Sequence, residues 1–214
     1  MAAGMTHLTL IRHAQARAGV DGIVGGPTGD TGLTEMGRRQ AEALRDRLLD
    51  MGFEVDIVLT SVLPRAIETA DILAPAFGGI ETVADCEFCE LHPGEADGLT
   101  WAEYVERYGD ASPRPPSQRF APGGESVLEL DARAVRAVAD VVERFPEEKV
   151  VIVTHGGFIS AVCLHLLGYS MGGDRPFFLD PENTSLTTWS TVDDDARHWR
   201  LDRYNDAAHL ETLR

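Results

Sequence analysis

The sequence predicts an α/β fold of three layers, α/β/α, with a mainly parallel sheet and an antiparallel hairpin at its edge. Short apolar runs alternate with amphipathic helical segments from residue 7 to residue 78, an order that is typical of parallel strands joined by helices. The same pattern returns at residues 125–168. Residues 183–205 alternate apolar and polar side chains around an Asp-rich turn, which predicts the edge hairpin.

The first half of the chain contains two strand and helix units. Residues 7–12 are rich in apolar and β-branched side chains and predict a buried strand, and the glycine-rich residues 13–32 predict a functional loop. A helix is expected over residues 34–52. Its apolar positions at helical spacing are Met36, Ala41, Leu44, Leu48 and Met51. Residues 55–61 and 63–78 repeat the strand and the helix.

The second half begins with a long amphipathic helix at residues 125–146, in which Ser126 and Glu129 form a capping box. A strand at residues 149–155 and a helix at residues 156–168 follow. These elements complete the parallel part of the predicted sheet.

The region between the two halves is expected to form a lid segment over the sheet. Residues 106–124 are rich in proline and show no helical period, which indicates a loop. We expect a lid segment at about residues 92–123 within a single domain that spans residues 1–214.

Composition excludes several classes of partner. The net charge of -16 argues against nucleic acid and against an anionic membrane surface, because both need an extended basic face. The apolar runs are too short to cross a bilayer. Three cysteines cannot form a fully paired disulfide framework, and the N-terminus lacks the layout of a signal peptide. We therefore expect a cytoplasmic protein whose partner is neither nucleic acid nor a membrane but a small metabolite, which the residues described next identify as phosphorylated.

Polar residues follow each of the predicted parallel strands. His13 follows the first strand, Ser61 and Arg65 follow the second, and His155 with Gly156 follow the later one. Ligands bind beyond the carboxyl ends of parallel strands, so these groups should meet on one rim of the sheet.

Two arginines with two histidines suit a phosphoryl group. Arg12 and Arg65 would hold its oxygens in bidentate fashion, and His13 could attack phosphorus directly. His155 would donate a hydrogen bond as charge builds in the transition state. Such a site needs neither a metal ion nor a cofactor.

An alkoxide leaving group needs a proton, so a carboxylic acid should lie near the same rim. Residues 89–98 offer Glu90. By composition, Glu87, Glu95 and Asp97 are equally available, and spacing does not choose among them.

Six segments carry a resemblance to a known family. They are RHA at residues 12–14, DTGLTEMGRRQAEAL at 30–44, SVLPRAIETA at 61–70, ELHPGEADGLT at 90–100, GGES at 123–126 with Arg133, and VTHGG at 153–157. In this order they resemble the histidine phosphatase superfamily, in the branch that includes the cofactor-dependent phosphoglycerate mutases. The resemblance covers nearly the whole chain.

That resemblance implies a phosphoglycerate-mutase-like fold and a phosphohistidine intermediate on His13, with Glu90 as proton donor. It implies that the phosphate is bound by Arg12, Arg65, His155 and Gly156.

Departures from the family pattern favour hydrolysis over phosphate transfer between hydroxyls. Residues 18–19 stand where the mutase branch has Trp-Asn, and residues 92–93 replace an aromatic ring. Of the paired lid arginines only the separated Arg114 and Arg119 remain. We therefore expect metal-independent hydrolysis of a small phosphomonoester. A cofactor-dependent phosphoglycerate mutase is the alternative, as is a catalytically silent phospho-ligand binding module, which Ala14 in place of the family glycine permits.

Two further features have a structural interpretation at this stage. Cys86 and Cys89 have the C-x-x-C spacing of redox or zinc sites, and His92 is a third possible ligand. No second ligand pair accompanies them, which favours small buried thiols and no bound metal. Trp101 stands at helical spacing with Val105, which predicts packing between the lid segment and the core.

Overall fold

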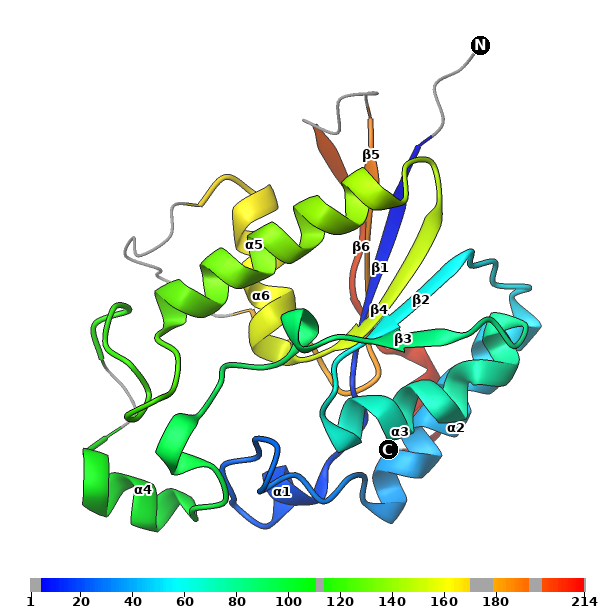
Figure 1. Cartoon of the computed structure of the whole chain (residues 1–214). Coiled ribbons are helices and arrows are strands. Elements are labelled where there is room, and N and C mark those ends of the chain that lie inside the picture. The colour runs from blue at the N-terminus through cyan, green and yellow to red at the C-terminus, as the bar shows by residue number, and fades with distance from the viewer. Residues whose placement is uncertain (1–4, 111–113, 170–178, 193–197, 214) are drawn as a thin grey trace.

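The computed structural model describes residues 5–110, 114–169, 179–192 and 198–213 (Figure 1). Its centre is a six-stranded sheet with the strand order β3-β2-β4-β1-β5-β6. The strands are β1 (His7–Arg12), β2 (Ile57–Thr60), β3 (Thr82–Ala84), β4 (Lys149–Thr154), β5 (Leu186–Thr191) and β6 (Trp199–Asp206). Strands β1 to β4 run parallel, whereas β5 is antiparallel to β1 and to β6. The predicted fold class is confirmed.

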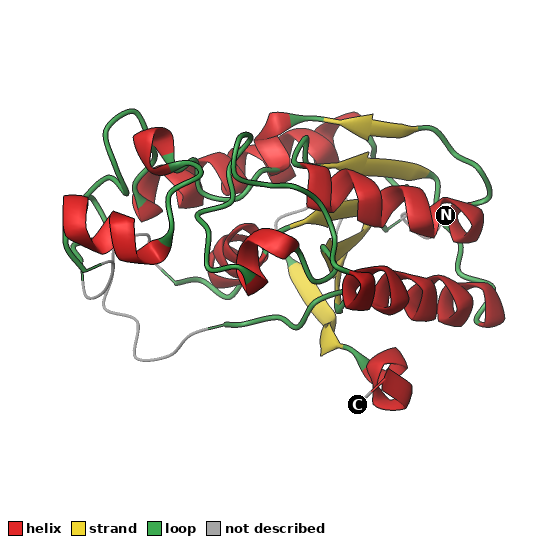
Figure 2. Cartoon of the chain, turned by 90° about the horizontal axis from the view of Figure 1, so that it is seen from below, coloured by secondary structure: helices red, strands yellow, loops and turns green. Residues whose placement is uncertain are grey.

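Helices cover both faces of this sheet (Figure 2). They are α1 (Arg17–Val20), α2 (Glu35–Asp50), α3 (Pro64–Leu73), α4 (Trp101–Tyr108), α5 (Val127–Arg144) and α6 (Gly156–Leu166). Short 3-10 helices span Ala74–Phe77, Cys86–Phe88, Gly94–Ala96 and Ala208–Leu213. Among the described residues, none of the helices has the length and apolarity needed to cross a membrane.

Strand β4 shows why both faces are covered. Successive side chains of a strand point to opposite faces, and β4 is buried from Val150 to Thr154. Val151 and Val153 pack with α2 and α3, whereas Val150 and Ile152 pack with α5 and α6. A strand that is apolar on both faces requires a helical layer on each side.

The register of the parallel strands defines one functional edge. Ile152 of β4 pairs with Leu10 of β1 on one side and with Leu59 of β2 on the other. The carboxyl ends of these three strands therefore lie together, and the chain leaves them at His13, Ser61 and His155. Figure 1 shows α1 and α4 beyond this edge.

Two sequence-based expectations need correction. Met36 and Met51 were expected on the apolar face of the helix, but they are 36% and 49% exposed. They lie at the two ends of α2, whereas Leu44 and Leu48 lie within it and pack in the core. The helix expected over residues 63–78 ends at Leu73 and continues as a 3-10 turn. Strand β3 at the sheet edge was not expected.

The lid segment is more ordered than its prolines indicate. It contains α4, which begins with a capping box of Thr100 and Glu103. Tyr104 is buried, stacks on Phe120 with ring centroids 4.3 Å apart, and donates a hydrogen bond to the Phe120 carbonyl. Arg114 donates to the Tyr104 hydroxyl. The lid segment thus has a small apolar core of its own.

That residues 1–214 form a single domain remains a prediction.

Candidate active site

Three polar side chains from separate elements meet at the carboxyl edge of the sheet. His13 follows β1, Arg65 lies in the first turn of α3, and His155 precedes α6. The two imidazole rings have centroids 5.0 Å apart. Arg65 Nε donates to His13 Nε2 at 3.1 Å and to His155 Nδ1 at 3.2 Å. The structure therefore brings together three of the residues that the sequence placed on this rim.

The backbone sets the tautomer of His13. Its Nδ1 lies 2.7 Å from the carbonyl oxygen of Ala14. A carbonyl only accepts, so Nδ1 carries the proton and Nε2 has the free electron pair. That pair points toward Arg65 Nε. Nε2 is thus the nitrogen that can act as a nucleophile.

His155 has the opposite tautomer in the same arrangement. Its Nδ1 accepts from Arg65 Nε, so its Nε2 carries the proton and donates to the Ser61 hydroxyl at 2.8 Å. Ser61 Oγ in turn donates to Cys89 Sγ at 3.2 Å. A chain of hydrogen bonds therefore runs from Arg65 to Cys89.

Burial keeps both imidazoles neutral. His13 is 8% exposed and His155 is fully buried. Burial, followed by the charge of Arg65, lowers the pKa of each histidine well below its usual 6.5. Both effects disfavour the imidazolium form. At physiological pH each ring keeps an unprotonated nitrogen.

Asp30 is the counter-ion that allows Arg65 to be buried. Its carboxylate accepts from Arg65 NH1 at 2.9 Å and from the Arg65 backbone N–H at 3.1 Å. Gly25 offers its carbonyl to the same NH1 at 2.8 Å. Sequence reasoning did not assign Asp30 a role. The sequence did contain a signal for it. A buried arginine needs an anionic partner, and because the glycine-rich loop holds few carboxylates, Asp30 was one of few candidates.

Arg12 has an unused hydrogen-bond donor. Its NH1 donates to the Pro181 carbonyl and lies 3.3 Å from Asp180 Oδ1, whereas Arg12 Nε is buried without a partner among the described residues. Gly156 lies against this guanidinium, since a Cβ built there would be 3.5 Å from Arg12 Cζ. A buried guanidinium donor without a partner points to an anion.

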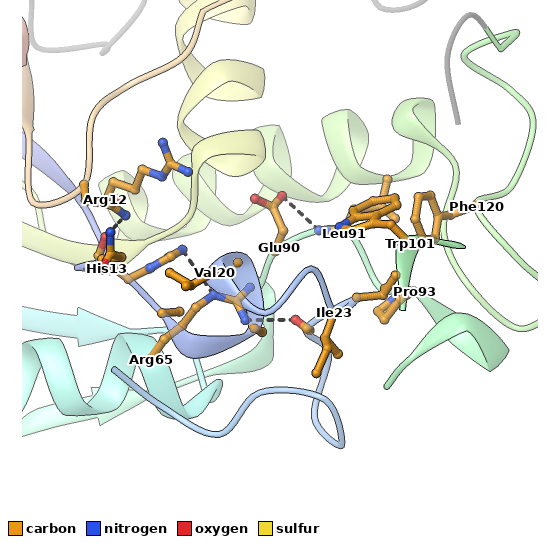
Figure 3. Close-up of a pocket in the computed structure, with 17 residues that line it drawn as sticks. Arg12, His13, Val20, Ile23, Arg65, Glu90, Leu91, Pro93, Trp101 and Phe120 are labelled. Carbon is orange, nitrogen blue, oxygen red and sulfur yellow. Dashed lines mark hydrogen bonds between the residues drawn. The ribbon is translucent and has the colours of Figure 1, made fainter. Parts of the chain in front are cut away.

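Glu90 is the carboxylate that geometry selects. Its Oε2 accepts from the Gly157 backbone N–H at 2.9 Å, and its Oε1 accepts from Leu91 N–H at 3.0 Å. A side chain at position 157 would displace Glu90 from this position, because a Cβ there would lie 2.1 Å from Glu90 Oε1. Glu90 is thus held at the start of α6, facing the cavity (Figure 3).

The competing carboxylates lie elsewhere. Asp97 accepts backbone N–H groups of Gly26, Thr28 and Gly29 at 2.7–2.9 Å and so fastens the glycine-rich loop. Glu87 and Glu95 are exposed and do not line the cavity.

The cavity at this edge has a volume of about 550 Å³ and two chemically different ends. Figure 3 shows Arg12, His13 and Arg65 at one end, Glu90 between, and an apolar group at the other. The apolar group at that end is Leu91, Pro93, Trp101 and Phe120, and Val20 lies beside Arg65. Other apolar lining residues are Ala16, Ala18, Ile23 and Val24. His155 and Gly156 do not line the cavity but lie behind the arginines.

Several side chains differ from expectation. Trp101 contacts Tyr104 and Phe120, as packing predicts, but it also lines the cavity. Asn183 lines the cavity and donates to the His13 carbonyl at 2.9 Å. Sequence reasoning missed Asn183, although the chain returns into antiparallel β5 at the same edge where β1 ends.

Neither lid arginine reaches the cavity. Arg114 donates to lid carbonyls and to Tyr104, and Arg119 pairs with Glu129. Ala14 also points away, since its methyl group is buried against Leu33, so this replacement leaves the cavity unchanged.

Comparisons with known proteins agree with this geometry. Residues 8–207 match the model of the histidine phosphatase superfamily (branch 1). A metal-independent phosphoserine phosphatase of Arabidopsis thaliana is 29% identical over 98% of this chain and 85% of its own. A 2,3-bisphosphoglycerate-dependent phosphoglycerate mutase of Brucella melitensis is 30% identical over 75% of this chain and 81% of its own. A mycobacterial glucosyl-3-phosphoglycerate phosphatase in complex with VO3 has a TM-score of 0.76 and 29% identity, covering 93% of this chain and 98% of its own.

The buried histidines predict a stability that falls in acid. In the unfolded chain each histidine takes up a proton near pH 6.5, whereas the lowered pKa values keep His13 and His155 neutral in the folded protein. Below about pH 6.5 the unfolded state therefore binds more protons. Each histidine then removes up to about 1.4 kcal/mol of unfolding free energy per pH unit, down to its folded pKa.

Urea unfolding between about pH 7.5 and pH 5 measures this effect. The unfolding free energy of the wild type should fall more steeply with acidification than that of His13→Gln or His155→Gln. Equal slopes in all three proteins would contradict the assignment.

Proposed function

The chain belongs to the histidine phosphatase superfamily, and we propose that it hydrolyses a small phosphomonoester without a metal ion, through a phosphohistidine formed on His13. The observation that carries this proposal is the buried, neutral His13, whose Nε2 electron pair faces Arg65 because the Ala14 carbonyl holds the proton on Nδ1. Its relatives include enzymes named as phosphatases, which supports a phosphatase-type enzyme.

In the first step His13 Nε2 attacks phosphorus, a P–N bond forms, and the P–O bond to the leaving group breaks. Arg12 Nε and the Arg65 guanidinium bind the non-bridging oxygens, whose charge they stabilise in the transition state. Arg65 Nε, which contacts both histidines in the free protein, would turn its donor to a phosphoryl oxygen. Glu90 in its acid form gives its proton to the leaving oxygen.

In the second step water replaces the alcohol. Glu90, now ionised, takes a proton from that water, the oxygen attacks phosphorus, and the P–N bond to His13 breaks. Inorganic phosphate leaves, and Glu90 and His13 return to their starting forms. Gly157 and Leu91 hold the Glu90 carboxylate through both steps.

Ser61 gives His155 a second hydrogen-bonding state. A hydroxyl can both donate and accept. Once Arg65 has turned to the phosphoryl group, His155 can lose its Nε2 proton to water and take up one from water on Nδ1, and Ser61 can then turn its hydroxyl proton from Cys89 to the free Nε2. The Nδ1 proton of His155 lies on the side of Arg65, where it can donate to a phosphoryl oxygen. We propose that substrate binding favours this second state.

The cavity favours a phosphatase over a mutase. A mutase must hold a second charged group of its substrate, but the end of the cavity away from His13 is apolar and both lid arginines have other partners. A leaving group with an apolar body fits this end.

The three cysteines are free thiols, which is in keeping with the reducing cytoplasm that we propose as the location.

Phosphate release from an aryl phosphate in excess chelator tests the mechanism. The wild type should turn over, and His13→Ala should lose roughly three orders of magnitude or more in kcat. Acid-labile phosphate on His13 should appear in quenched wild-type samples, and Cys163→Ala serves as a control that touches no proposed catalytic residue.

Loss of turnover in chelator, or full activity of His13→Ala, would sink this mechanism. Tight binding of the ester without turnover would support the binding module. Faster isomerisation than phosphate release in the presence of a bisphosphate primer would support a mutase.

A pair of glycine variants isolates the role of Glu90. Gly157→Ala places a Cβ against the Glu90 carboxylate, whereas Gly156→Ala places one at an ordinary contact distance from Arg12. We expect kcat to fall about 100-fold in Gly157→Ala and much less in Gly156→Ala. The loss should be larger for alkyl than for aryl esters, because alkoxides need the proton more. Similar losses in the two variants would argue against Glu90 as the acid.

The apolar end of the cavity predicts substrate preference. Burying an aromatic leaving group contributes about 1.5–3 kcal/mol, so kcat/KM for naphthyl phosphate should exceed that for phosphoserine about 10- to 100-fold. Trp101→Ala should reduce this ratio, while His13-dependent turnover remains. A phosphoserine value equal to the naphthyl phosphate value would contradict the prediction.

A further inference from the structure

We propose that Cys86, Cys89 and His92 form a binding site for a thiophilic divalent cation, Zn²⁺, beside the active site. Their three ligand atoms lie within 4.8 Å of one another, and Cys86 Sγ is 3.4 Å from His92 Nε2. In a zinc tetrahedron, Zn–S and Zn–N bonds of about 2.3 and 2.0 Å place sulfur and nitrogen about 3.5 Å apart. The separation of Cys86 Sγ and His92 Nε2 thus matches the one that zinc requires, and Cys89 Sγ lies within 4.8 Å of both atoms.

The orientation of His92 supports a metal more than a chance contact. Its Nε2 faces Cys86, while its Nδ1 lies 3.5 Å from Glu125 Oε1. Metal-binding histidines commonly donate their second ring nitrogen to a carboxylate, which fixes the tautomer. Glu125 is itself held by two hydrogen bonds from Arg133 at 2.8 and 2.9 Å.

The backbone presents both sulfurs through a tight turn. A 3-10 helix spans Cys86–Phe88, and Cys89 N–H donates to the Cys86 carbonyl at 3.0 Å. Arg133 NH1 binds the carbonyls of Glu87 and Cys89 at 2.8 and 3.0 Å. A buried arginine therefore holds the backbone of the turn, while Cys86 Sγ contacts His92 and Cys89 Sγ accepts a hydrogen bond from Ser61.

Charge and access fit zinc as well. Each thiol loses its proton to solvent when it ligates, so two thiolates balance one Zn²⁺, while Arg133 and Glu125 balance each other. Cys86 is exposed, which gives the ion a route in. Three protein ligands leave the fourth position to water, an arrangement that permits exchange. The spacing of the cysteines had suggested only buried thiols; His92 and Glu125 change that interpretation.

Zinc at this site should slow turnover, a consequence that rests on the proposed function. Cys89 as a ligand is a thiolate, which accepts the Ser61 hydroxyl proton more strongly than a thiol does. Ser61 then stays turned to Cys89, so His155 keeps its proton on Nε2 and has none on Nδ1 to donate to the phosphoryl group. The ion would hold His155 in its first hydrogen-bonding state.

Cobalt titration of the whole, reduced and metal-stripped chain tests the site without any substrate. One equivalent of Co²⁺ should give thiolate charge-transfer absorption and the intense visible bands of tetrahedral coordination, and Zn²⁺ should displace it. Cys86→Ser should weaken Zn²⁺ binding at least 100-fold, and Glu125→Gln should weaken it about 10- to 100-fold. Cys163→Ala, which changes a buried thiol outside the set of three ligands, should bind as the wild type does.

Three outcomes would overturn the proposal. The first is the absence of charge-transfer bands in the wild type, and the second is their persistence in Cys86→Ser. The third is a loss of two thiols to a disulfide in metal-free protein exposed to air, with no protection by Zn²⁺, which would make the pair a redox site. Slower turnover with Zn²⁺, reversed by chelator and weaker in Cys86→Ser, would support the coupling; failure of the phosphatase assay leaves the cobalt result unaffected.

Discussion

The contact of Arg65 with two neutral imidazoles is the interaction on which the rest of the site depends. One guanidinium nitrogen donates to His13 and to His155 at once, which requires both rings to present an unprotonated nitrogen to the same point. Burying the Arg65 guanidinium beside two neutral rings would destabilise the folded protein if the charge had no partner. Asp30, which belongs to the glycine-rich loop, is that partner. The loop is therefore needed for the electrostatics of the site as well as for its shape.

Backbone groups set the tautomer of His13 and the orientation of Glu90. The Ala14 carbonyl holds the His13 proton on Nδ1, and the Gly157 and Leu91 N–H groups bind the two oxygens of the Glu90 side chain. Ala14 follows β1 and Gly157 lies at the start of α6, so the parallel register of β1 and β4 places these two groups, whereas Leu91 lies in the loop after the 3-10 helix Cys86–Phe88. Strand pairing therefore positions His13 directly, and it positions Glu90 through the Gly157 N–H group.

The fold and most of the rim were predictable because they depend on strong local patterns. Alternating apolar strands and amphipathic helices predicted the layers, and strand ends predicted the meeting of His13, Arg65 and His155. Asp30 and Asn183 escaped prediction because their roles arise from contacts across 35 and 170 residues of chain, which periodicity does not encode. Spacing alone did not separate Asp97 from Glu90, and the family resemblance selected Glu90. In the structure Asp97 binds backbone N–H groups of the glycine-rich loop, which sets it apart from Glu90.

The same tautomer logic connects the candidate active site to the thiol pair. In a chain of hydrogen bonds such as His155–Ser61–Cys89, the donors can all point one way along the chain or all point the other way. The groups at the two ends determine which of these two orders is favoured. At one end stands Arg65, which can only donate; at the other stands Cys89, which accepts weakly as a thiol and strongly as a thiolate. Ser61 lies between them and can turn either way. In the free protein Arg65 fixes this order, because its donor requires His155 Nδ1 to accept. Under the coupling proposed above, the charge on Cys89 would influence His155 only when Arg65 has turned to a bound phosphoryl group, and a thiolate would then preserve the order of the free protein without any movement of the backbone.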